Sequence, residues 1–592
     1  MATTPQDLSL LNGQYISPTG DKTIDSMTSG YRWDLSTSRT VDWSISDGFF
    51  GEYWIYLSSA IANIDYAISS FSYYADINFN YIGHFTDPAA ANSWGSDINF
   101  SIDGVGLLFT DDTAWAGAFF PDPLDPNRGD IYINLNSQAN YLPSYEPGSA
   151  GFFLLLHEIG HALGLKHPHD DGGTGRPTFS ELSLQEFDID YYSIMSYMDD
   201  YDLDFIRFDP ATPMIMDVLA LQYLYGKNIS TNANNSTHII ESVDYYYTIW
   251  DAAGFDTIDQ SSSSEGWVIY LPDVQLSDLV DTRAGFAVPF GDLELSSPTT
   301  LAWLTGDIEN LIGSSHIDEL HGNYLDNQIS GLGGNDSIYG GGGNDTINGG
   351  LGNDFIDGHT GSDVATFINS LTDHRFGMDG NTLIVKYFDS TDTLVNIESL
   401  IFGGSTAISV EYLQTSGLLE ELMTLHISGT TTKVLPDIYT GPVSWLDYAL
   451  LGSGTSDVAI GTSQNDFFNL LGGDDAANGS GGDDVIDGGS GSNFLTGGGG
   501  RDDFFLDGRG GTTTWATITD WQAGERLTVW GWRPGVSKAQ WVDGDGAAGW
   551  TGVTMHGDLD GNGVIDTSVT WTGLTLSQLP TPLEFDGLLW FT

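Results

Sequence analysis

A nine-residue repeat constrains the fold of this chain more than any other feature of its sequence. The first block spans residues 331–366 and reads GLGGNDSIY, GGGGNDTIN, GGLGNDFID and GHTGSDVAT, with two degenerate copies leading into it from residue 313. A second block spans residues 452–505, from GSGTSDVAI to GGGGRDDFF. One such repeat cannot bury an apolar face alone, so the copies must stack on one another to form a core.

The repeat pattern predicts a parallel β-roll filled with calcium. Glycine permits tight turns that bring carbonyl oxygens inward, aspartate supplies hard oxygen ligands, and the apolar eighth residue, such as Ile338 or Ile347, packs between two layers of short strands. A flexible Gly/Asp linker is the alternative, although a linker needs no apolar residue at a fixed position. Asparagine takes the sixth position at residues 327 and 493, and the other sixth positions are the predicted calcium ligands: Asp318, Asp336, Asp345, Asp354, Asp363, Asp457, Asp466, Asp475, Asp484 and Asp502.

The formal charge of −64, from 17 basic and 81 acidic residues, agrees with a calcium-loaded protein. Carboxylates that repel one another in the free chain become ligands when calcium binds, so we expect the repeats to be expanded at low calcium and ordered at high calcium. The same charge repels nucleic acid and anionic membrane surfaces, so neither is an expected partner. The lack of cysteine excludes disulfides, thiolate metal sites and thiol nucleophiles.

Helical patterns occur in the region before residue 230, where we predict an α+β domain. Residues 151–165 are apolar and carry paired histidines, and residues 213–225 read PMIMDVLALQYLY, between an entering proline and Gly226. Beyond residue 230 the sequence is typical of an all-β protein, with strand-like segments near residues 256, 381, 515 and 552.

The segment HEIGHALGLKH, which begins at His157, predicts a metal site. Four helical residues turn through about 400°, so His157 and His161 lie one turn apart on the same face. His167 would leave that face in a continued helix, but Gly164 can end the helix and turn the chain back. Three neutral imidazoles suit zinc with an open position for water, and Glu158 can take a proton from that water and pass it to a leaving amine. Core histidines on a buried helix are the alternative, which requires neither Gly164 nor His167.

HEIGHALGLKHP, together with SIMSY at residues 193–197, resembles the metzincin zinc endopeptidases and within them the serralysin group. The resemblance extends through TPMIMDVLALQYLYG, YTIWDAAGFDTID and DIENLIG and into the RTX-type calcium repeats. It implies that Met195 forms an apolar floor beneath one catalytic zinc ion. It also implies that Tyr197 is a further zinc ligand that swings away when substrate binds and then stabilises the oxyanion. Without that context, both residues would be ordinary core.

The resemblance implies how a peptide substrate is held. Metzincin substrates lie as an added strand on a sheet edge above the zinc, and AGAFFP occupies the corresponding place in this sequence. An extended peptide there would exchange main-chain hydrogen bonds with the edge. The expected edge residues are Ala116, Gly117, Ala118 and Phe119, and an ordinary core strand is the alternative.

Two acidic clusters lie outside the repeats. Asp251, Asp256 and Glu309 match positions that hold calcium between domains in serralysins, so we expect them to be calcium ligands, although Ala253 replaces the usual glycine. The segment DLDGNGVID, from Asp558, resembles the start of an EF-hand loop, but valine at its twelfth position and the flanking strands favour a β-turn.

The two ends of the chain bear on export. The first residues have neither the basic start nor the apolar core of a secretory signal peptide. In serralysins, such repeats accompany one-step export by a type I secretion apparatus, which reads an uncleaved C-terminal signal. FDGLLWFT at the C-terminus has an acid followed by apolar residues, as that signal does, and an ordinary final strand is the alternative. Residues 1–30 are expected to be either an arm or an inhibitory propeptide.

We therefore predict an α+β metzincin protease domain followed by an all-β part with parallel β-rolls and β-sandwich-like strands. The expected protein is a secreted, extracellular bacterial zinc endopeptidase that cleaves internal bonds of proteins, is monomeric as is usual in the family, and has no membrane span. Two alternatives are a calcium-loaded surface or adhesion protein with a vestigial protease domain, and a C-terminal binding module with a protease attached. The predicted divisions are 1–30 (arm or propeptide), 31–230 (protease), 231–370 (β domain with the first roll, 313–366), 371–451 (β linker), 452–506 (second roll) and 507–592 (C-terminal β region with the possible export signal).

Overall fold

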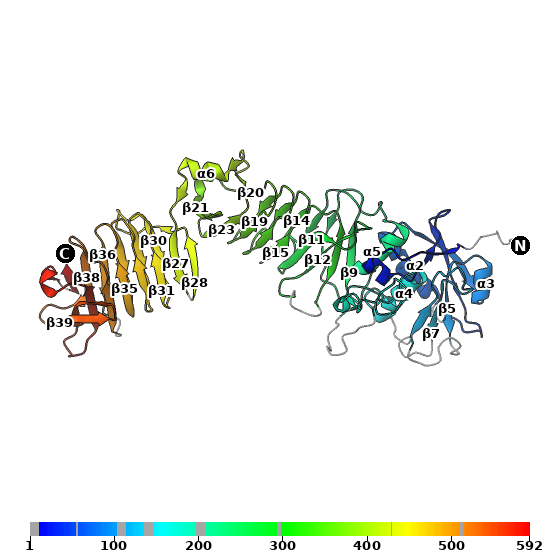
Figure 1. Cartoon of the computed structure of the whole chain (residues 1–592), viewed down its shortest axis with the longest axis horizontal. Coiled ribbons are helices and arrows are strands. Elements are labelled where there is room, and N and C mark those ends of the chain that lie inside the picture. The colour runs from blue at the N-terminus through cyan, green and yellow to red at the C-terminus, as the bar shows by residue number, and fades with distance from the viewer. Residues whose placement is uncertain are drawn as a thin grey trace. The chain divides into compact units, whose positions relative to one another are not determined.

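The computed structural model describes residues 11–54, 57–103, 114–134, 146–196, 208–292, 298–427, 429–509, 513–585 and 587–592. The chain forms two compact units (Figure 1). The first comprises Met1–Phe367 and Asn396–Gly404, and the second comprises Ile368–Val395 and Ser405–Thr592. No helix in the described ranges is long and apolar enough to cross a membrane.

The N-terminal part of the first unit is an α+β domain, as predicted. Its sheet has the strand order β4-β3-β5-β7-β6, and only β6 is antiparallel to its neighbour. The strands are β3 (Thr40–Ser46), β4 (Asn78–Phe85), β5 (Ile98–Asp103), β6 (Ala116–Ala118) and β7 (Asp130–Asn134), and a separate pair is formed by β1 (Gly13–Tyr15) and β2 (Tyr31–Trp33). The helices are α1 (Lys22–Met27), α2 (Leu57–Tyr74), α3 (Pro88–Ser93), α4 (Ala150–Ala162), the 3₁₀ helix η2 (Gln185–Phe187) and α5 (Ile215–Tyr225).

Helices α4 and α5 correspond to the two helical patterns in the sequence, whereas α2 was not predicted. Helix α2 is rich in serine, isoleucine and aromatic residues, which are weak helix formers. Its buried residues Ile64, Ala67, Ile68 and Phe71 nevertheless follow helical spacing and face the domain core. Tertiary packing of this apolar face therefore outweighs the low intrinsic helix propensity.

The rest of the first unit is an all-β stack that includes the first roll. One sheet runs β8-β10-β14-β16-β18-β20-β24 and the facing one runs β9-β13-β12-β11-β15-β17-β19. The strands are β8 (Thr237–His238), β9 (Tyr247–Asp251), β10 (Thr257–Asp259), β11 (Trp267–Gln275), β12 (Arg283–Pro289), β13 (Ala302–Gly306), β14 (Asn310–Ile312), β15 (Glu319–His321), β16 (Gln328–Ser330), β17 (Ser337–Tyr339), β18 (Thr346–Asn348), β19 (Phe355–Asp357), β20 (Val364–Phe367) and β24 (Ser399–Phe402).

The second unit begins with an antiparallel hairpin stack and continues into the second roll. Strands β21 (Arg375–Asp379), β22 (Thr382–Tyr387) and β23 (Ser390–Val395) pair in order, preceded by η3 (Leu371–Asp373), and β26 (Leu419–Glu420) pairs with β21. Strand β25 (Ile408–Ser409) and helix α6 (Val410–Ser416) directly precede β26 in the chain.

Two facing sheets form the second roll and the C-terminal region, and Figure 1 shows their strands stacked side by side. One contains β28 (Thr430–Val434), β27 (Met423–Ile427), β31 (Asp457–Ile460), β33 (Ala476–Asn478), β35 (Ser492–Thr496), β37 (Thr514–Ile518), β41 (Thr567–Thr572), β40 (Trp550–Asp558) and β39 (Lys538–Ala547). The other contains β29 (Asp437–Ile438), β30 (Tyr448–Leu451), β32 (Asp466–Asn469), β34 (Val485–Asp487), β36 (Asp503–Asp507), β38 (Arg526–Trp532), β43 (Gly587–Phe591) and β42 (Leu583–Phe585), with η4 (Leu576–Gln578) before β42.

Both rolls follow the predicted physical pattern. The eighth residues Ile338 and Ile347 are fully buried, and in the second roll Phe468 and Ile486 fill the same interior. The turn glycines are required by close backbone contact: a Cβ at Gly352, whose φ is +126°, would lie 1.6 Å from the carbonyl oxygen of Gly334. The strand-like segments near residues 256, 381, 515 and 552 are β10, β22, β37 and β40.

Candidate metal centre and calcium sites

Helix α4 carries the first two histidines of the predicted metal site. Ser149 caps its N-terminus, because the Oγ of Ser149 accepts a hydrogen bond from the Phe152 amide at 3.2 Å. From His157 to Ala162 every residue of the helix is buried. His157 and His161 therefore face the domain interior one turn apart, as the spacing predicts.

The turn after α4 brings the third histidine back to the other two. Gly164 has a φ of +100°, and a Cβ on it would lie 2.2 Å from the carbonyl oxygen of Tyr31, so the turn requires glycine. The chain then pairs with the N-terminal segment, where the Lys166 amide donates to the Met27 carbonyl at 3.0 Å. The N-terminal segment thus helps to position His167.

The three imidazoles meet through their Nε2 atoms. The Nε2 of His167 lies 3.1 Å from that of His157 and 2.9 Å from that of His161. The Nδ1 of His157 lies 2.7 Å from the Ile194 carbonyl oxygen and that of His161 lies 2.9 Å from the Leu165 carbonyl oxygen. Because a carbonyl only accepts hydrogen bonds, Nδ1 carries the proton in both rings and Nε2 carries a lone pair.

This arrangement fits a bound zinc ion. Burial lowers the pKa of His161 to about 4 and that of His167 to about 2, and it lowers the pKa of His157 as well, so the rings are neutral. Neutral rings with converging lone pairs repel one another unless a cation lies between them. The Nδ1 of His167 contacts a carboxylate oxygen of Asp170 at 2.6 Å, which is the outer-shell partner typical of a zinc-binding histidine.

Glu158 lies next to the first histidine and is buried, with 3% of its surface exposed. Its Oε2 has no hydrogen-bond partner among the described residues. Burial raises the pKa of this carboxyl to about 8 when no cation is near. A buried carboxyl with an unpartnered oxygen, next in sequence to the first of three converging histidines, has the basicity that a general base requires.

Met195 is fully buried in the domain core. A Cβ at Gly160 would lie 2.6 Å from the Met195 sulfur, so α4 packs directly against this methionine. Asp217 of α5 holds the methionine turn by accepting hydrogen bonds from the Ser193 hydroxyl and the Ile194 amide, both at 2.7 Å. Sequence reasoning missed Asp217, and the available signal was one acid inside an otherwise apolar helix.

Tyr197 lies outside the described residues. The predicted substrate edge is an edge strand of the sheet, next to the histidines. Strand β6, which contains Ala116, Gly117 and Ala118, ends the sheet order, and the Phe119 amide continues the pairing by donating to Asp130 at 3.0 Å. The next residue, Phe120, contacts the His161 ring edge-on with 5.4 Å between centroids.

Residues 11–30, which were predicted to belong to an arm or propeptide, pack on this domain. Arg176, only 3% exposed, donates to the carbonyl oxygens of Thr28 and Ile16 at 3.0 and 2.7 Å. A Cβ at Gly13 would lie 1.9 Å from the carbonyl oxygen of Pro121, so the N-terminal segment lies against the chain that follows β6.

Acidic and amide side chains form columns along the rolls, each residue standing directly before a strand or within its first two residues. In the first roll, the amide of one member donates to the side chain of the next: Asn327 to Asp345, Asp345 to Asp363, and Asp363 to Glu398, each at 2.8 Å. Strand register adds two more members to this column, Asp256 before β10 and Glu309 before β14. Glu398 was missed by sequence reasoning because it follows a long insertion rather than a nonapeptide.

Several column carboxylates have one oxygen with no hydrogen-bond partner among the described residues. These buried oxygens belong to Asp336, Asp345, Asp363, Asp475, Asp484 and Asp502. Burial raises the pKa to about 7 for Asp336 and Asp345, to about 8 for Asp484, and to about 6 for Asp475 and Asp502. Buried carboxylate oxygens beside turn carbonyls fit calcium ligands. Asp354 belongs to the same series, since it accepts the Asp336 amide at 3.0 Å.

The sixth residues that begin the rolls differ from these open sites. Ser314 donates through its amide and hydroxyl to Asp318. Ser453 does the same for Asp457, and Thr462 for Asp466. At these three positions, hydrogen bonds from the turn satisfy the carboxylate oxygens, whereas the corresponding oxygens of the open sites have no partner among the described residues.

Asn493 replaces a carboxylate within the second roll. Its Oδ1 accepts the Asp475 amide at 2.9 Å, as an aspartate would. Its Nδ2 donates to the carbonyl oxygens of Gly488 and Gly489 at 2.8 and 3.3 Å. The side-chain amide therefore forms hydrogen bonds with carbonyl oxygens that would otherwise be available to a cation.

The predicted calcium ligands Asp251, Asp256 and Glu309, which lie outside the repeats, also come together. Glu309 Oε2 accepts the Asp256 amide at 2.8 Å, and Asp251 contacts His238 Nε2 at 2.7 Å. Asp251 Oδ1 and Asp256 Oδ2 are buried without a partner in the described chain. At the end of the second roll, strand register places Glu525 beside Asp502. Glu525 is 1% exposed with an unpartnered Oε1, and burial raises its pKa to about 7.

The DLDGNGVID segment lies in the turn between β40 and β41. Carboxylate oxygens of Asp558, Asp560 and Asp566 come within 4.8 Å of one another. Asp558 already accepts the amides of Gly561 and Gly563, at 2.7 and 2.9 Å, which is the hydrogen bonding of a tight turn.

Comparison with known proteins gives two kinds of match. A family model for the RTX calcium-binding nonapeptide repeat matches four copies, at residues 321–356, 330–365, 451–486 and 478–508. Serralysin of Proteus mirabilis is 31% identical over 269 residues, which is 41% of this chain and 51% of that protein. The resemblance to the serralysins is confirmed.

Two further relatives agree with this similarity. Serralysin C of Dickeya chrysanthemi is 36% identical over 182 residues, 28% of this chain and 35% of its own length. Metalloprotease AprA of Pseudomonas entomophila (strain L48) is 32% identical over 252 residues, 39% of this chain and 47% of its own length. The chain thus spans about half the length, or less, of these three relatives.

The serralysin similarity confirms the predicted fold class, a metzincin domain followed by an all-β repeat part. Zinc and calcium, the predicted cofactors, agree with the three-histidine cluster and with the repeat family. The assignment of individual zinc and calcium ligands remains a prediction.

Proposed function

We propose that this chain is a secreted zinc-dependent endopeptidase that hydrolyses internal peptide bonds of proteins and uses calcium to fold its repeats. The observation that carries this proposal is the convergence of three Nε2 atoms, that of His167 lying 3.1 Å from that of His157 and 2.9 Å from that of His161. The residue that follows His157, Glu158, has a buried Oε2 with no hydrogen-bond partner among the described residues. An adhesion protein with a vestigial protease domain would not need to keep a buried carboxyl with an unsatisfied oxygen, which destabilises the fold.

His157, His161 and His167 would hold the zinc ion, and their Nδ1 contacts fix the ring orientations. When bound, zinc supplies a Lewis acid that polarises the substrate carbonyl and makes water more acidic. Glu158 takes the proton of the attacking water and transfers it to the nitrogen of the leaving amine. Tyr197 is proposed as the oxyanion-stabilising residue and further zinc ligand, from the serralysin resemblance.

Strand β6 supports a binding mode for the peptide. The strand has β7 on one side and ends the sheet order, so a substrate can pair with its other side as an added strand. Phe120, which follows the edge residues, contacts His161, and this brings the edge close to the metal ligands. The proposed substrates are extended segments of proteins.

Export and calcium binding form the second part of the proposal. Open aspartate oxygens in the rolls have raised pKa values without a cation, so the repeats fold fully only where calcium is available. This dependence suits a chain that leaves a cell through a type I secretion apparatus and folds outside. The proposed calcium ligands are the open members of the columns together with Asp251, Asp256 and Glu309.

Casein hydrolysis by the wild type and by Glu158→Ala, both in calcium, tests the enzyme proposal. The expected result is about one bound zinc in each protein and a loss of activity of about 100-fold or more in the variant. A wild type that binds zinc but does not cleave casein, even after N-terminal trimming, would overturn the protease and favour the adhesion protein.

A further inference from the structure

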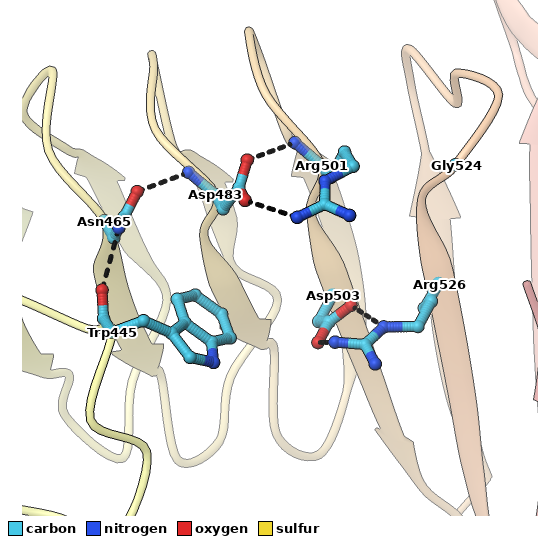
Figure 2. Close-up of a pocket in the computed structure, with 7 residues that line it drawn as sticks. All are labelled: Trp445, Asn465, Asp483, Arg501, Asp503, Gly524 and Arg526. Atoms are coloured by element: carbon cyan, nitrogen blue, oxygen red, sulfur yellow. Dashed lines mark hydrogen bonds and ion pairs between the residues drawn. The ribbon is translucent and has the colours of Figure 1, made fainter.

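The second roll carries a polar cavity of about 470 Å³ on its outer surface, far in sequence from the three histidines. Figure 2 shows its walls. Asn465, Asp483 and Arg501 form a row along one side, Trp445 stands at one end, and Asp503 pairs with Arg526 at the other. We call this the Trp445 cavity.

The row is built by the repeat itself. Asn465, Asp483 and Arg501 are the fifth residues of successive turns on one side of the roll, so each follows the last after 18 residues. Asn465 Oδ1 accepts the Asp483 amide at 2.6 Å, and Asp483 accepts the Arg501 amide at 2.9 Å. The spacing of neighbouring strands, about 4.8 Å, therefore sets the distance between these polar groups.

The opposite groups are also held in place. Asp503 and Arg526 lie on paired strands β36 and β38 and form an ion pair through both carboxylate oxygens. Arg501 reaches Asp483 through its guanidinium at 3.0 Å as well as through its amide. Planar amide, carboxylate and guanidinium groups thus line the cavity in fixed positions, with both donors and acceptors directed to nearby space.

The charges of the cavity balance. Two arginines face two aspartates, so the lining has no net charge, although the whole chain carries −64. A polyanion would be repelled by the chain and would have to displace the aspartates from the arginines. The cavity therefore favours a neutral ligand with many hydroxyl groups, since a hydroxyl both donates and accepts hydrogen bonds.

Trp445 supplies the apolar part. It precedes β30 in a loop, is 39% exposed, and is fixed by its carbonyl, which accepts the Asn465 side-chain amide at 2.8 Å. Figure 2 shows the indole extending toward the Asp503 and Arg526 pair. An exposed aromatic face attracts the weakly positive C–H bonds of a saturated ring.

We propose that the Trp445 cavity binds a neutral polysaccharide. One sugar ring would lie against the indole of Trp445, and its hydroxyls would bond to Asn465, Asp483, Arg501 and the Asp503–Arg526 pair. A neutral sugar polymer matches the cavity in all three respects: an apolar face, many paired donors and acceptors, and no charge. The site lies in the roll rather than the protease domain, so it does not rest on the proposed enzyme activity.

The test uses the full-length, calcium-loaded chain in native affinity gels that contain hydroxyethylcellulose, xyloglucan, glucomannan or dextran, and in pull-downs on insoluble cellulose and chitin. We expect retardation or retention by at least one of them. Trp445→Ala should weaken that binding at least about tenfold, as loss of a central aromatic contact does. Arg501→Gln should also weaken polymer binding. The backbone amide at position 501 can still bond to Asp483 in this variant, so the turn is kept.

Trp550→Ala is the matched control, because Trp550 is 43% exposed in the same unit but does not line the cavity. It should bind within about twofold of the wild type, since removal of a non-contacting side chain is near neutral. All variants must keep the wild-type calcium content and the wild-type midpoint of urea unfolding. The anionic polymers alginate and pectate and unfolded casein are tested alongside. The proposal is overturned if the chain binds none of the neutral polymers, or binds only the anionic polymers or only casein. It is also overturned if Trp445→Ala binds as well as the wild type.

Discussion

The Oε2 atom of Glu398 accepts the amide hydrogen of Asp363 at 2.8 Å, and so takes the place that Asp345 and Asp363 hold in the two preceding turns of the same column. Glu398 thus ends the carboxylate column of the first roll. We expect Glu398→Ala to destabilise the chain by about 1–2 kcal/mol, because it removes a hydrogen bond to a charged acceptor at the end of the stack. Urea unfolding at fixed calcium measures this.

Glu398→Gln is the control for that variant. The glutamine side chain keeps an oxygen that can accept the Asp363 amide, so its stability should stay closer to the wild type. If both variants unfold at the wild-type urea concentration, Glu398 is not a cap.

Asn493→Asp should create an additional calcium site. The amide of Asn493 donates to two glycine carbonyls, and a carboxylate there would leave those oxygens facing a negative charge. Calcium would satisfy all of these oxygens together. Equilibrium dialysis should find one more bound calcium than in the wild type, and the variant should be less stable than the wild type after calcium removal. An unchanged calcium content in a folded variant would contradict the prediction.

Asp466 and Asp484 are sixth residues in adjacent turns of the same sheet, but they should differ in calcium binding. Thr462 bonds to both oxygens of Asp466, whereas one oxygen of Asp484 is buried without a partner in the described chain. Asp484→Asn should therefore lower the calcium content by at least one ion, and Asp466→Asn should leave it unchanged. Atomic absorption on desalted protein distinguishes these results, and equal losses would show that the capped turn binds calcium too.

The sequence predicted the repeats and the histidine cluster, but it did not predict every residue that joins them in the structure. The HExxH spacing and Gly164 were sufficient for the three histidines, because helical rotation and a left-handed turn determine where those side chains go. The nonapeptide period was sufficient for the buried isoleucines. These features depend on residues close together in the chain.

What the sequence did not reveal depends on contacts between distant residues. Helix α2 forms because its apolar face packs on the core, and its local propensity is weak. Glu398 and Glu525 join the columns through strand register across insertions, so no repeat marks them. Whether a sixth residue is open or capped depends on a serine or threonine four residues earlier, which became evident only from the hydrogen bonds.

Calcium-free protein should become less stable as pH rises. Unfolded aspartate has a pKa of about 3.9, whereas burial raises the pKa of Asp345 to about 7 and that of Asp484 to about 8. The folded state therefore holds more protons between about pH 4 and 8, and its stability, fully present below pH 4, falls through that range. Thermal unfolding of calcium-depleted protein at pH 5 and pH 8 should give the lower Tm at pH 8.

Calcium reverses this dependence, because it competes with protons for the same oxygens. Its affinity should rise from pH 5 to pH 8, and calcium addition at pH 7 should release protons into a weak buffer. Asp484→Asn should reduce both the fall in Tm and the proton release. A calcium-free Tm that rises with pH would mean that these carboxyls are ionised in the folded chain without a cation.

Asp217→Ala should weaken zinc binding although, in the described part of the chain, the Asp217 carboxylate bonds to Ser193, Ile194 and Met214 rather than to a histidine. The carboxylate accepts the Ser193 hydroxyl and the Ile194 amide, and the Ile194 carbonyl in turn orients His157. Removing the acceptor leaves buried donors unsatisfied, which should destabilise the domain by about 2–4 kcal/mol, and a shift of that segment would misalign the His157 ring.

Competition with a zinc chelator should show an affinity loss of about 10-fold or more, as for other outer-shell substitutions. Ser183→Ala, at an exposed turn position of the same domain, should change neither quantity. If Asp217→Ala lowered stability but kept the wild-type zinc affinity, the methionine turn would support the fold without positioning the metal.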